Sequence, residues 1–493
     1  MQNGHLPEVP VWDIWEIVCP GLTAGNPFTD YDIMGEFSCG GETLRVPGFY
    51  DGDGRYIVRM MPSCEGVYMY RISGSFSHEV FTGSFRAIRP EPGVHGPVRV
   101  KDTYHFAYAD GTRYMPVGTT CYVWHLQTPE LFEQTLNTLS ESGFNKIRFC
   151  VFPKHYDYNH NEPFAYPFEA AEPAGDAPFA WNFARFHPAY FRHLEKAILR
   201  LGELGIEADI IILHPYDRWG FSQMTLEENL RYFRYLAARL SAFRNVWWSL
   251  ANEYDVLTGR TQDDWEAYAA ALSAQDPYGH LMSIHNGPEF YDYTRPWITH
   301  CCIQRQDIYL TAEHTDEWRR QYGKPVIVDE MGYEGDIQHG WGNISPEEIT
   351  RRFWEATVRG GYGGHGETYL HESELLWWSH GGVLRGESPA RLAFLRRFLD
   401  ELPAPLMRAE AGWAELMAIP EGCEDEAPSC YLYYYSFMRP GFRDYTLPEG
   451  ARYRVEVIDT WNMTRDDRGV FEGSFRLPLP GRSGMAVYMR RVD

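Results

Sequence analysis

Residues 207–255 read EADIIILHPYDRWGFSQMTLEENLRYFRYLAARLSAFRNVWWSLANEYD and contain one complete strand–helix–strand unit. The apolar run EADIIIL is followed by a loop and then by ENLRYFRYLAARLSAF, whose apolar residues recur at spacings of three and four, as on one face of a helix. The apolar run VWWSLA comes next. Apolar runs that alternate with amphipathic helices predict parallel strands joined by helical crossovers.

The same rhythm extends over residues 114–402 and supplies eight candidate strands. Their ranges are 114–119, 146–152, 207–213, 246–251, 281–285, 298–303, 325–330 and 363–368. Capping boxes at Thr225 and Ser345, and Pro129 after Thr128, mark helix starts between them. Eight units favour a (β/α)8 TIM barrel, because no Gly-rich phosphate-binding turn follows the first strand. A doubly wound open sheet is the alternative.

The segments on either side of the barrel show strand patterns instead. Short alternating runs broken by Gly, Pro and Asp occupy residues 11–90, and similar runs such as RYRVEVIDTW follow residue 405. Both patterns are typical of antiparallel sandwiches. We therefore predict an α/β chain with an N-terminal Ig-like β-sandwich at 1–97, a catalytic barrel at 98–403 and a C-terminal β-sandwich at 404–493.

Composition limits the partners that the chain can have. Its 493 residues carry a net charge of −23 with 44% hydrophobic residues, which is a globular composition. The negative charge argues against nucleic acid and anionic membranes as partners. The absence of a long apolar run and of a basic leader predicts a soluble, cytoplasmic protein. Nine cysteines without metal-ligand spacing indicate reduced thiols, with no metal or cofactor expected. The oligomeric state stays open.

Two glutamates directly follow apolar strands. Glu253 lies in the sequence SLANEYD after the fourth strand, and Glu330 ends VIVDE in the seventh. One such glutamate alone would be interpreted as a solvated loop charge. Two of them, three strands apart in a ring of eight, face each other across the mouth of the barrel. Glycoside cleavage needs two carboxyl groups that converge on one bond in this way.

These motifs resemble those of the clan A glycoside hydrolases, the cellulase-like barrels that include family 5. The resemblance implies that Glu253, preceded by Asn252, is the general acid/base and that Glu330 is the nucleophile of a retaining reaction. It further implies that Asn252 contacts the 2-hydroxyl of the sugar, a bond that strengthens at the transition state.

Three further residues match supporting positions of that clan. Arg148, inside the second strand, is similar to the arginine beside the nucleophile, with a purely structural ion pair as the alternative. His214, after the third strand, matches a histidine that contacts substrate, and a structural histidine is the alternative. Trp378 looks like the platform under the reactive sugar, with Trp377 as its buried neighbour and an exchange of their two roles as the alternative.

The whole-chain layout narrows the resemblance. VWDIWEI, GNPFTD and GFYDGDGRYIVRMMP precede a barrel whose first strand carries PVGTTCYVWH, and together they look like the apiosidase-like group of bacterial glycosidases. That group implies a glycan or glycoside with a terminal pentose or related sugar, such as apiose, arabinose or xylose, and no metal. His125 ends the last motif and is a further candidate for substrate binding.

One motif departs from the family 5 pattern. Members usually carry His-x-Tyr on strand six, with the tyrosine near the nucleophile, whereas ITHCCIQRQ offers Gln304 and no tyrosine. We expect Gln304 and His285, which follows strand five, to supply part of that function. The long aromatic loop at 154–182 is predicted to form a wall of the substrate pocket, with a packed surface loop as the alternative.

Together these features predict a retaining, exo-acting β-glycosidase that removes a terminal sugar from an oligosaccharide or glycoside. Exo action rests on long loops that would close a pocket. One alternative is a metal-dependent barrel hydrolase that uses His214, His285, His365 or His371. A second is a non-catalytic carbohydrate-binding protein. Transglycosylation or phosphorolysis on the same carboxylates is a third.

Overall fold

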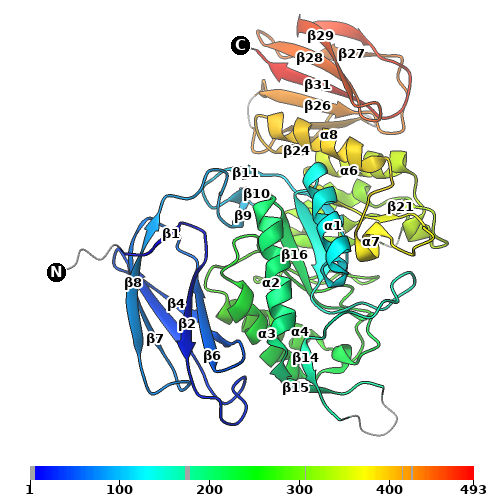
Figure 1. The fold of residues 1–493 in the computed structure, drawn as a ribbon. Helices are drawn as coiled ribbons and strands as arrows, with labels where there is room; N and C mark the ends of the chain where they lie inside the picture. Colours follow the sequence, from blue (N-terminus) through cyan, green and yellow to red (C-terminus); the bar gives the residue numbers. More distant parts are fainter. Residues whose placement is uncertain (1–5, 173–177, 306, 413–414, 424–425, 493) are drawn as a thin grey trace.

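A barrel of eight parallel strands forms the centre of the chain (Figure 1). The computed structural model describes residues 6–172, 178–305, 307–412, 415–423 and 426–492. The barrel strands are β12 (Val117–Thr120), β13 (Lys146–Cys150), β16 (Glu207–Leu213), β17 (Val246–Ala251), β18 (Met282–Ser283), β19 (Cys301–Gln304), β20 (Val326–Glu330) and β22 (Tyr362–His365). Each falls on one of the eight predicted runs, and a single bridge between His285 and Cys302 joins β18 to β19. The barrel is therefore nearly closed, which excludes the doubly wound sheet.

Helices cover the outside of the barrel and explain the continuous apolar strands. Every residue of β16 and β17 is buried, as expected where helices lie outside a parallel sheet. The helices are α1 (Pro129–Glu141), α2 (Pro188–Glu203), α3 (Leu226–Leu240), α4 (Gln262–Gln275), α5 (Thr315–Tyr322), α6 (Pro346–Val358), α7 (Trp377–His380) and α8 (Ser388–Glu401).

The predicted helix starts are found, with one correction. Thr225 and Glu228 form the reciprocal capping box of α3. Ser345 accepts the Glu348 amide at the start of α6, but the Glu348 carboxylate binds Arg351 and Arg352 instead of returning to the cap. The second box is therefore only half formed, because charged partners outcompete the backbone amide for the carboxylate.

A small sheet closes the amino-terminal end of the barrel. Strands β9 (Val98–Lys101), β10 (His105–Tyr108) and β11 (Arg113–Tyr114) form it. The Phe106 ring lies 5.3 Å from Trp247, near the start of β17, and 5.6 Å from Tyr362, at the start of β22. With this end filled by side chains, the opposite end is the one that can hold a site.

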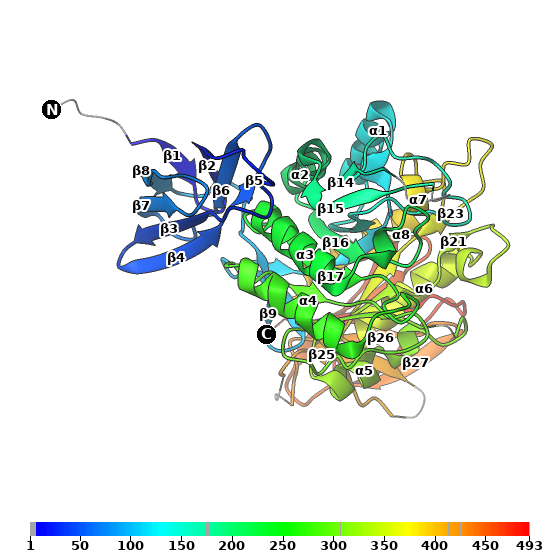
Figure 2. The ribbon, with the colours of Figure 1, turned by 90° about the horizontal axis from the view of Figure 1, so that it is seen from below.

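Two sheets enclose a separate core in the amino-terminal segment. Five strands pair in the order β1 (Glu8–Pro10), β8 (Phe81–Ile88), β7 (Gly66–Ser73), β3 (Met34–Cys39) and β4 (Glu42–Pro47), and three in the order β2 (Trp15–Pro20), β6 (Arg55–Met60) and β5 (Phe49–Tyr50). Figure 2 shows β5 and β6 beside α3. At this junction Glu195 lies 2.8 Å from Arg59 and 2.5 Å from Arg239, so buried ion pairs link the two parts.

The carboxyl-terminal segment packs on the other side of the barrel. Its six-stranded sheet runs β24 (Leu406–Ala409), β25 (Leu416–Pro420), β26 (Cys430–Tyr434), β31 (Met485–Arg491), β28 (Arg452–Asp459) and β29 (Thr464–Glu472), with β27 (Phe442–Thr446) and β30 (Ser474–Pro478) as a separate pair. Figure 1 shows this sheet next to α6 and α8. Trp354 of α6 stacks 5.8 Å from Tyr434, and Phe398 of α8 lies 5.2 Å from Tyr488. The boundaries predicted near residues 97 and 403 stay predictions.

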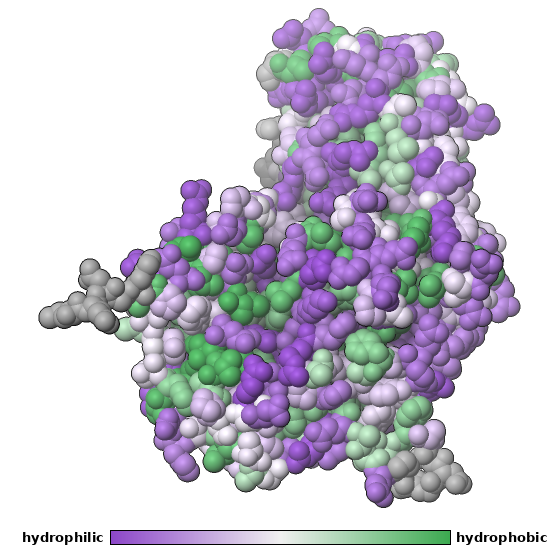
Figure 3. All heavy atoms as spheres, in the orientation of Figure 1, coloured by the Kyte–Doolittle hydropathy of each residue, from purple (hydrophilic) through white to green (hydrophobic). Residues whose placement is uncertain are grey.

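The surface is largely hydrophilic on the face that Figure 3 shows, with apolar residues in small separate patches. In the described ranges, no helix is both long and apolar enough to cross a membrane. All nine cysteines are free thiols, and most of them are buried.

Candidate active site

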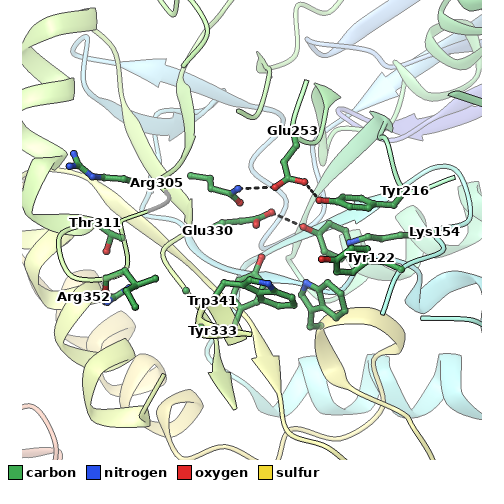
Figure 4. A pocket seen from close by; sticks show the side chains of 16 residues that line it. Tyr122, Lys154, Tyr216, Glu253, Arg305, Thr311, Glu330, Tyr333, Trp341 and Arg352 are labelled. Atoms are coloured by element: carbon green, nitrogen blue, oxygen red, sulfur yellow. Dashed lines mark hydrogen bonds between the residues drawn. The ribbon is translucent and has the colours of Figure 1, made fainter. Parts of the chain in front are cut away.

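A cavity of about 420 Å³ opens at the carboxyl ends of the barrel strands. Glu253 and Glu330 both line it, and Figure 4 shows them on facing parts of its wall. The other lining residues are Tyr122, Lys154, Tyr156, Tyr216, Gln304, Arg305, Ile308, Thr311, Gly332, Tyr333, Gly340, Trp341, Arg352 and Trp378. The two strand-end glutamates therefore share one cavity.

The backbone of Glu253 adopts an uncommon conformation. Its φ is 47°, in the left-handed region that non-glycine residues rarely occupy. Hydrogen bonds fix the chain on both sides, from the Asn252 amide to the Leu213 carbonyl at 2.9 Å and from the Tyr254 amide to the His285 carbonyl at 3.0 Å. Neighbouring strands thus hold a strained residue whose side chain lies in the cavity, as is frequent at functional sites.

Each carboxylate oxygen of Glu253 has a hydrogen-bond donor. Gln304 Nε2 donates to Oε1 at 2.8 Å, and the Tyr216 hydroxyl donates to Oε2. Asn252 Nδ2 lies 3.3 Å from the same Oε2. These three donors come from different strand ends, so the carboxyl group is positioned by the barrel as a whole.

Glu330 lies in a more strongly positive environment. Its Oε1 accepts the Tyr122 hydroxyl at 2.6 Å and Arg148 Nη1 at 2.8 Å, and His285 Nε2 lies 3.3 Å away. Burial alone would raise the pKa of Glu330, but His285, Arg148 and Tyr122 outweigh it and lower that pKa below its usual value. Glu330 is therefore ionised at neutral pH.

Arg148 connects the two halves of the site. Its Nη1 binds Glu330 and its Nη2 donates to Asn252 Oδ1 at 2.7 Å, while Asn252 also contacts Glu253. The guanidinium is a planar fork with fixed donor directions, so one side chain sets the positions of both partners. Arg148 is 1% exposed and lies beneath the cavity rather than in its lining.

The predicted tryptophan pair takes the expected arrangement. Trp378 lines the cavity, and Trp377 is fully buried behind it, with Nε1 donating to Thr119 at 2.9 Å. The Trp341 ring approaches Trp378 to 5.2 Å, and Tyr156 approaches it to 6.3 Å. Aromatic rings thus surround one side of the cavity, where a sugar face could stack.

Of the seven predicted substrate-binding residues, Gln304 and Trp378 line the cavity. Arg148, Asn252 and His285 are buried outside the lining but contact one of the two glutamates.

His125 and His214 are also outside the lining and make no hydrogen bond or ion pair with either glutamate. His125 is fully buried 5.4 Å from Phe149, because the chain after β12 turns into a short 3₁₀ helix, Trp124–Leu126, that carries it away from the mouth. His214 is also buried outside the lining, and burial lowers its pKa to about 4. Both histidines are neutral and belong to the packed structure around the site.

The long loop at 154–182 contributes less of the wall than predicted. Of its described residues, Lys154 and Tyr156 line the cavity. The rest includes the hairpin of β14 (Phe168–Ala170) and β15 (Trp181–Phe186), while residues 173–177 lie outside the described part of the chain.

Sequence reasoning missed several lining residues, including Tyr122, Lys154, Tyr216, Tyr333 and Trp341. Tyr122 supplies the phenol that strand six lacks, but it does so from the loop after the first strand. Only its nearness to the end of β12 could have indicated this. Lys154 and Tyr216 likewise follow barrel strands closely, at β13 and β16.

The histidines of the metal-dependent alternative lie apart. Within the described residues, no group of three or more His, Cys, Asp or Glu side chains is placed to hold a metal ion. His365 is stacked 4.8 Å from Phe144 inside the barrel, whereas His371 is exposed and binds Ser373 at 2.6 Å. Of the four candidates, His285 is the one that contacts Glu330.

Comparison with known proteins decides the family. The family model "Apiosidase-like, catalytic domain" matches residues 100–418, which include the whole barrel and both glutamates. The chain belongs to the apiosidase-like family. Two models for domains of unknown function, DUF5060 and DUF5605, match residues 8–75 and 418–490 of this apiosidase-like protein. A search of curated proteins found no match.

Solved structures agree with this assignment. A Bacteroides vulgatus protein, provisionally classed as a glycoside hydrolase, is 38% identical over 99% of this chain and 100% of its own, with a TM-score of 0.92. A family 5 glycoside hydrolase, also from Bacteroides vulgatus, is 17% identical over 81% of this chain and 93% of its own, with a TM-score of 0.59, and shares the fold. The apiosidase-like protein is a glycoside hydrolase, and its substrate is a carbohydrate.

Proposed function

We propose that this enzyme is a retaining, exo-acting β-glycosidase. The observation that carries the proposal is that Glu253 and Glu330, from strands four and seven, line one cavity while Glu330 is held ionised. An ionised carboxylate facing a second carboxyl group is the arrangement that double displacement requires.

In the first step, a Glu330 oxygen bonds to the anomeric carbon as the bond from that carbon to the leaving oxygen breaks. Glu253 gives its proton to the leaving oxygen. In the second step, Glu253 takes a proton from water, the water oxygen bonds to the anomeric carbon, and the ester to Glu330 breaks. Two inversions give net retention.

The surrounding residues support this assignment. Arg148 fixes the Asn252 carbonyl oxygen, which leaves the Asn252 amide group as the donor on the side of Glu253, and in this proposal it also donates to a sugar 2-hydroxyl. Trp378 offers a flat apolar floor for the sugar ring. Such contacts accelerate the reaction to the extent that they strengthen at the transition state.

Exo action is supported by the shape of the cavity. Tyr156, after β13, and Trp341, in the 3₁₀ helix Gly340–Gly342, both approach Trp378 from separate loops. A cavity walled in this way suits the end of a chain better than its middle, because a polymer needs a cleft that is open at both ends.

The test uses substitutions of the two glutamates and a panel of nitrophenyl pentosides and hexosides. Glu253→Ala should slow hydrolysis about 10²- to 10⁴-fold, the range for losing a general acid. Azide should partly rescue this variant with activated leaving groups and yield a β-glycosyl azide. Glu330→Gln should be inactive. For the wild type, proton NMR should show that the sugar is first released as the β-anomer. The exposed Glu372→Gln is the matched control. Unchanged hydrolysis by Glu330→Gln would refute the proposal.

A further inference from the structure

Lys154 is a buried cation in the middle of the site. It follows β13, is 3% exposed and lines the cavity beside the two glutamates (Figure 4). Its Nζ lies 3.6 Å from the centre of the Tyr122 ring, 4.3 Å from Tyr216 and 4.4 Å from Trp378. Tyr122 binds Glu330 and Tyr216 binds Glu253, so the ammonium lies close to where the cleaved sugar must sit.

This ammonium makes no direct ion pair in the described part of the protein, although the charges of Glu330 and Glu253 act on it from beyond 4.0 Å. No carboxylate of the described residues lies within 4.0 Å of Nζ, and none of those residues accepts a hydrogen bond from it. Both oxygens of Glu253 and Oε1 of Glu330 already accept hydrogen bonds, from Gln304, Tyr216, Tyr122 and Arg148, and Glu330 Oε2 lies more than 4.0 Å from Nζ. Three N–H donors therefore lie at the cavity against aromatic faces, and none of the described residues accepts a hydrogen bond from them.

The other cations that line the cavity are paired. Arg352 donates to Glu348 at 2.7 Å, and Arg305 lies 3.6 Å from Asp307. Burying an ammonium without a direct ion pair is costly, and burial outweighs the charges of Glu330 and Glu253 and lowers the pKa of Lys154 to about 8. The side chain is still mostly protonated at pH 7, so its charge is present when substrate binds.

We propose that Lys154 binds a carboxylate on the sugar at the cleavage site, so that the sugar released is a hexuronic acid. The inference rests on the proposed function, since it concerns the ring held between Glu253 and Glu330. A neutral sugar could be recognised by uncharged donors without the cost of burying an ammonium. An anionic sugar, in contrast, would be repelled by two carboxylates unless a cation offset them. The pentose that the family resemblance implied has no group to meet this charge.

The net charge of −23 makes this cation a local feature rather than part of a generally basic surface. A lysine ammonium binds one carboxylate as a point charge and through charge-assisted hydrogen bonds. Sulfate and phosphate esters share the same charge chemistry, so the experiment must separate them from a carboxylate.

The test compares kcat/KM for nitrophenyl β-glucuronide and β-galacturonide with the matched glucoside, galactoside and xyloside at pH 6.5. We expect the wild type to prefer a uronide over its neutral hexoside at least about tenfold, the size of one charge-assisted hydrogen bond. Lys154→Met should reduce that preference about 10- to 100-fold. Lys196→Met is the matched control, because Lys196 is exposed on α2 with its Nζ 5.2 Å from Phe132.

Each result decides the inference. Equal or better hydrolysis of neutral glycosides by the wild type would overturn it, and a preference for 6-sulfated or 6-phosphorylated glycosides would overturn the carboxylate assignment. If Lys154→Met does not fold, the preference of the wild-type enzyme for uronides over neutral glycosides still tests the inference. Should no glycoside be cleaved, the proposed function fails on its own, and calorimetry of glucuronate against glucose binding to Glu330→Gln tests Lys154 without turnover.

Discussion

Replacement of Arg148 by methionine tests the central link of the site. The variant keeps the length and burial of the aliphatic part of the side chain but removes the guanidinium that bridges Glu330 and Asn252. We expect the nucleophile to lose both its ionised state at low pH and its fixed position. The Asn252 carbonyl oxygen, held by the same guanidinium, should lose its main partner.

The size of the effect follows from the two hydrogen bonds. Each joins the charged guanidinium to an acceptor, half-buried Glu330 at 2.8 Å and buried Asn252 at 2.7 Å, and bonds of this kind contribute about 1.5–3 kcal/mol each. Tyr122 and His285 remain beside Glu330 and keep part of its stabilisation. A net loss of about 3 kcal/mol is therefore expected at the transition state, which lowers kcat/KM about 10²-fold.

The pH profile gives a second readout with a defined sign. In the wild type the positive neighbours lower the pKa of Glu330, so the nucleophile stays ionised well into the acidic range. Without Arg148 that pKa rises, and the acidic limb of kcat/KM should move to higher pH. A merely structural arginine would leave this limb in place.

The assay is the pH dependence of kcat/KM on a nitrophenyl glycoside that the wild type hydrolyses, with thermal unfolding measured in parallel. Arg260→Met is the control, because Arg260 also makes two hydrogen bonds, to the Ser222 and Met224 carbonyls, outside the active-site cavity. An Arg148→Met enzyme with kcat/KM within threefold of wild type and an unmoved acidic limb would refute the reasoning.

Two further predictions concern buried ionisable groups away from the cavity. Burial raises the pKa of Glu207 to about 8 from about 4.5, so the folded state keeps a proton that the unfolded state loses, and stability should fall by about 1.4 kcal/mol per pH unit between these values. In urea unfolding, Glu207→Gln should have the same free energy of unfolding as the wild type near pH 5 and a higher one as the pH rises. A difference that does not change with pH would contradict this. Lys146 binds Asp209 and Asp329 at 2.7 Å inside the barrel. Lys146→Met leaves these carboxylates without their cation and should lower the free energy of unfolding by about 3–5 kcal/mol. A loss below about 1 kcal/mol would show that the aspartates are protonated or hydrated instead.

The strained backbone at Glu253 shows why its neighbours matter. A residue at φ 47° relaxes unless adjacent hydrogen bonds hold it, and here Leu213 at the end of β16 and His285 just after β18 supply them. His285 therefore serves both glutamates: its backbone fixes the chain beside Glu253, while its ring approaches Glu330. Its sequence position after strand five predicted proximity to the site, but not this double contact.

The sequence by itself determined the barrel and the two strand-end glutamates. Period-two and period-3.6 patterns are local properties, so runs such as EADIIIL and the helix after Thr225 could be read directly from neighbouring letters. The pairing of Glu253 with Glu330 also followed, because strand order in a closed barrel fixes which strand ends face each other.

Only the tertiary structure decided which side chains surround those carboxylates. His125 and His214 were predicted to contact substrate from their sequence positions alone. A short 3₁₀ helix places His125 away from the cavity, and His214 is buried outside its lining. Tyr122 and Lys154 entered it from loops whose course no periodicity encodes. Contacts of this kind join residues far apart in the chain through rotamers and loop paths, and these are set by packing of the whole molecule rather than by any local pattern.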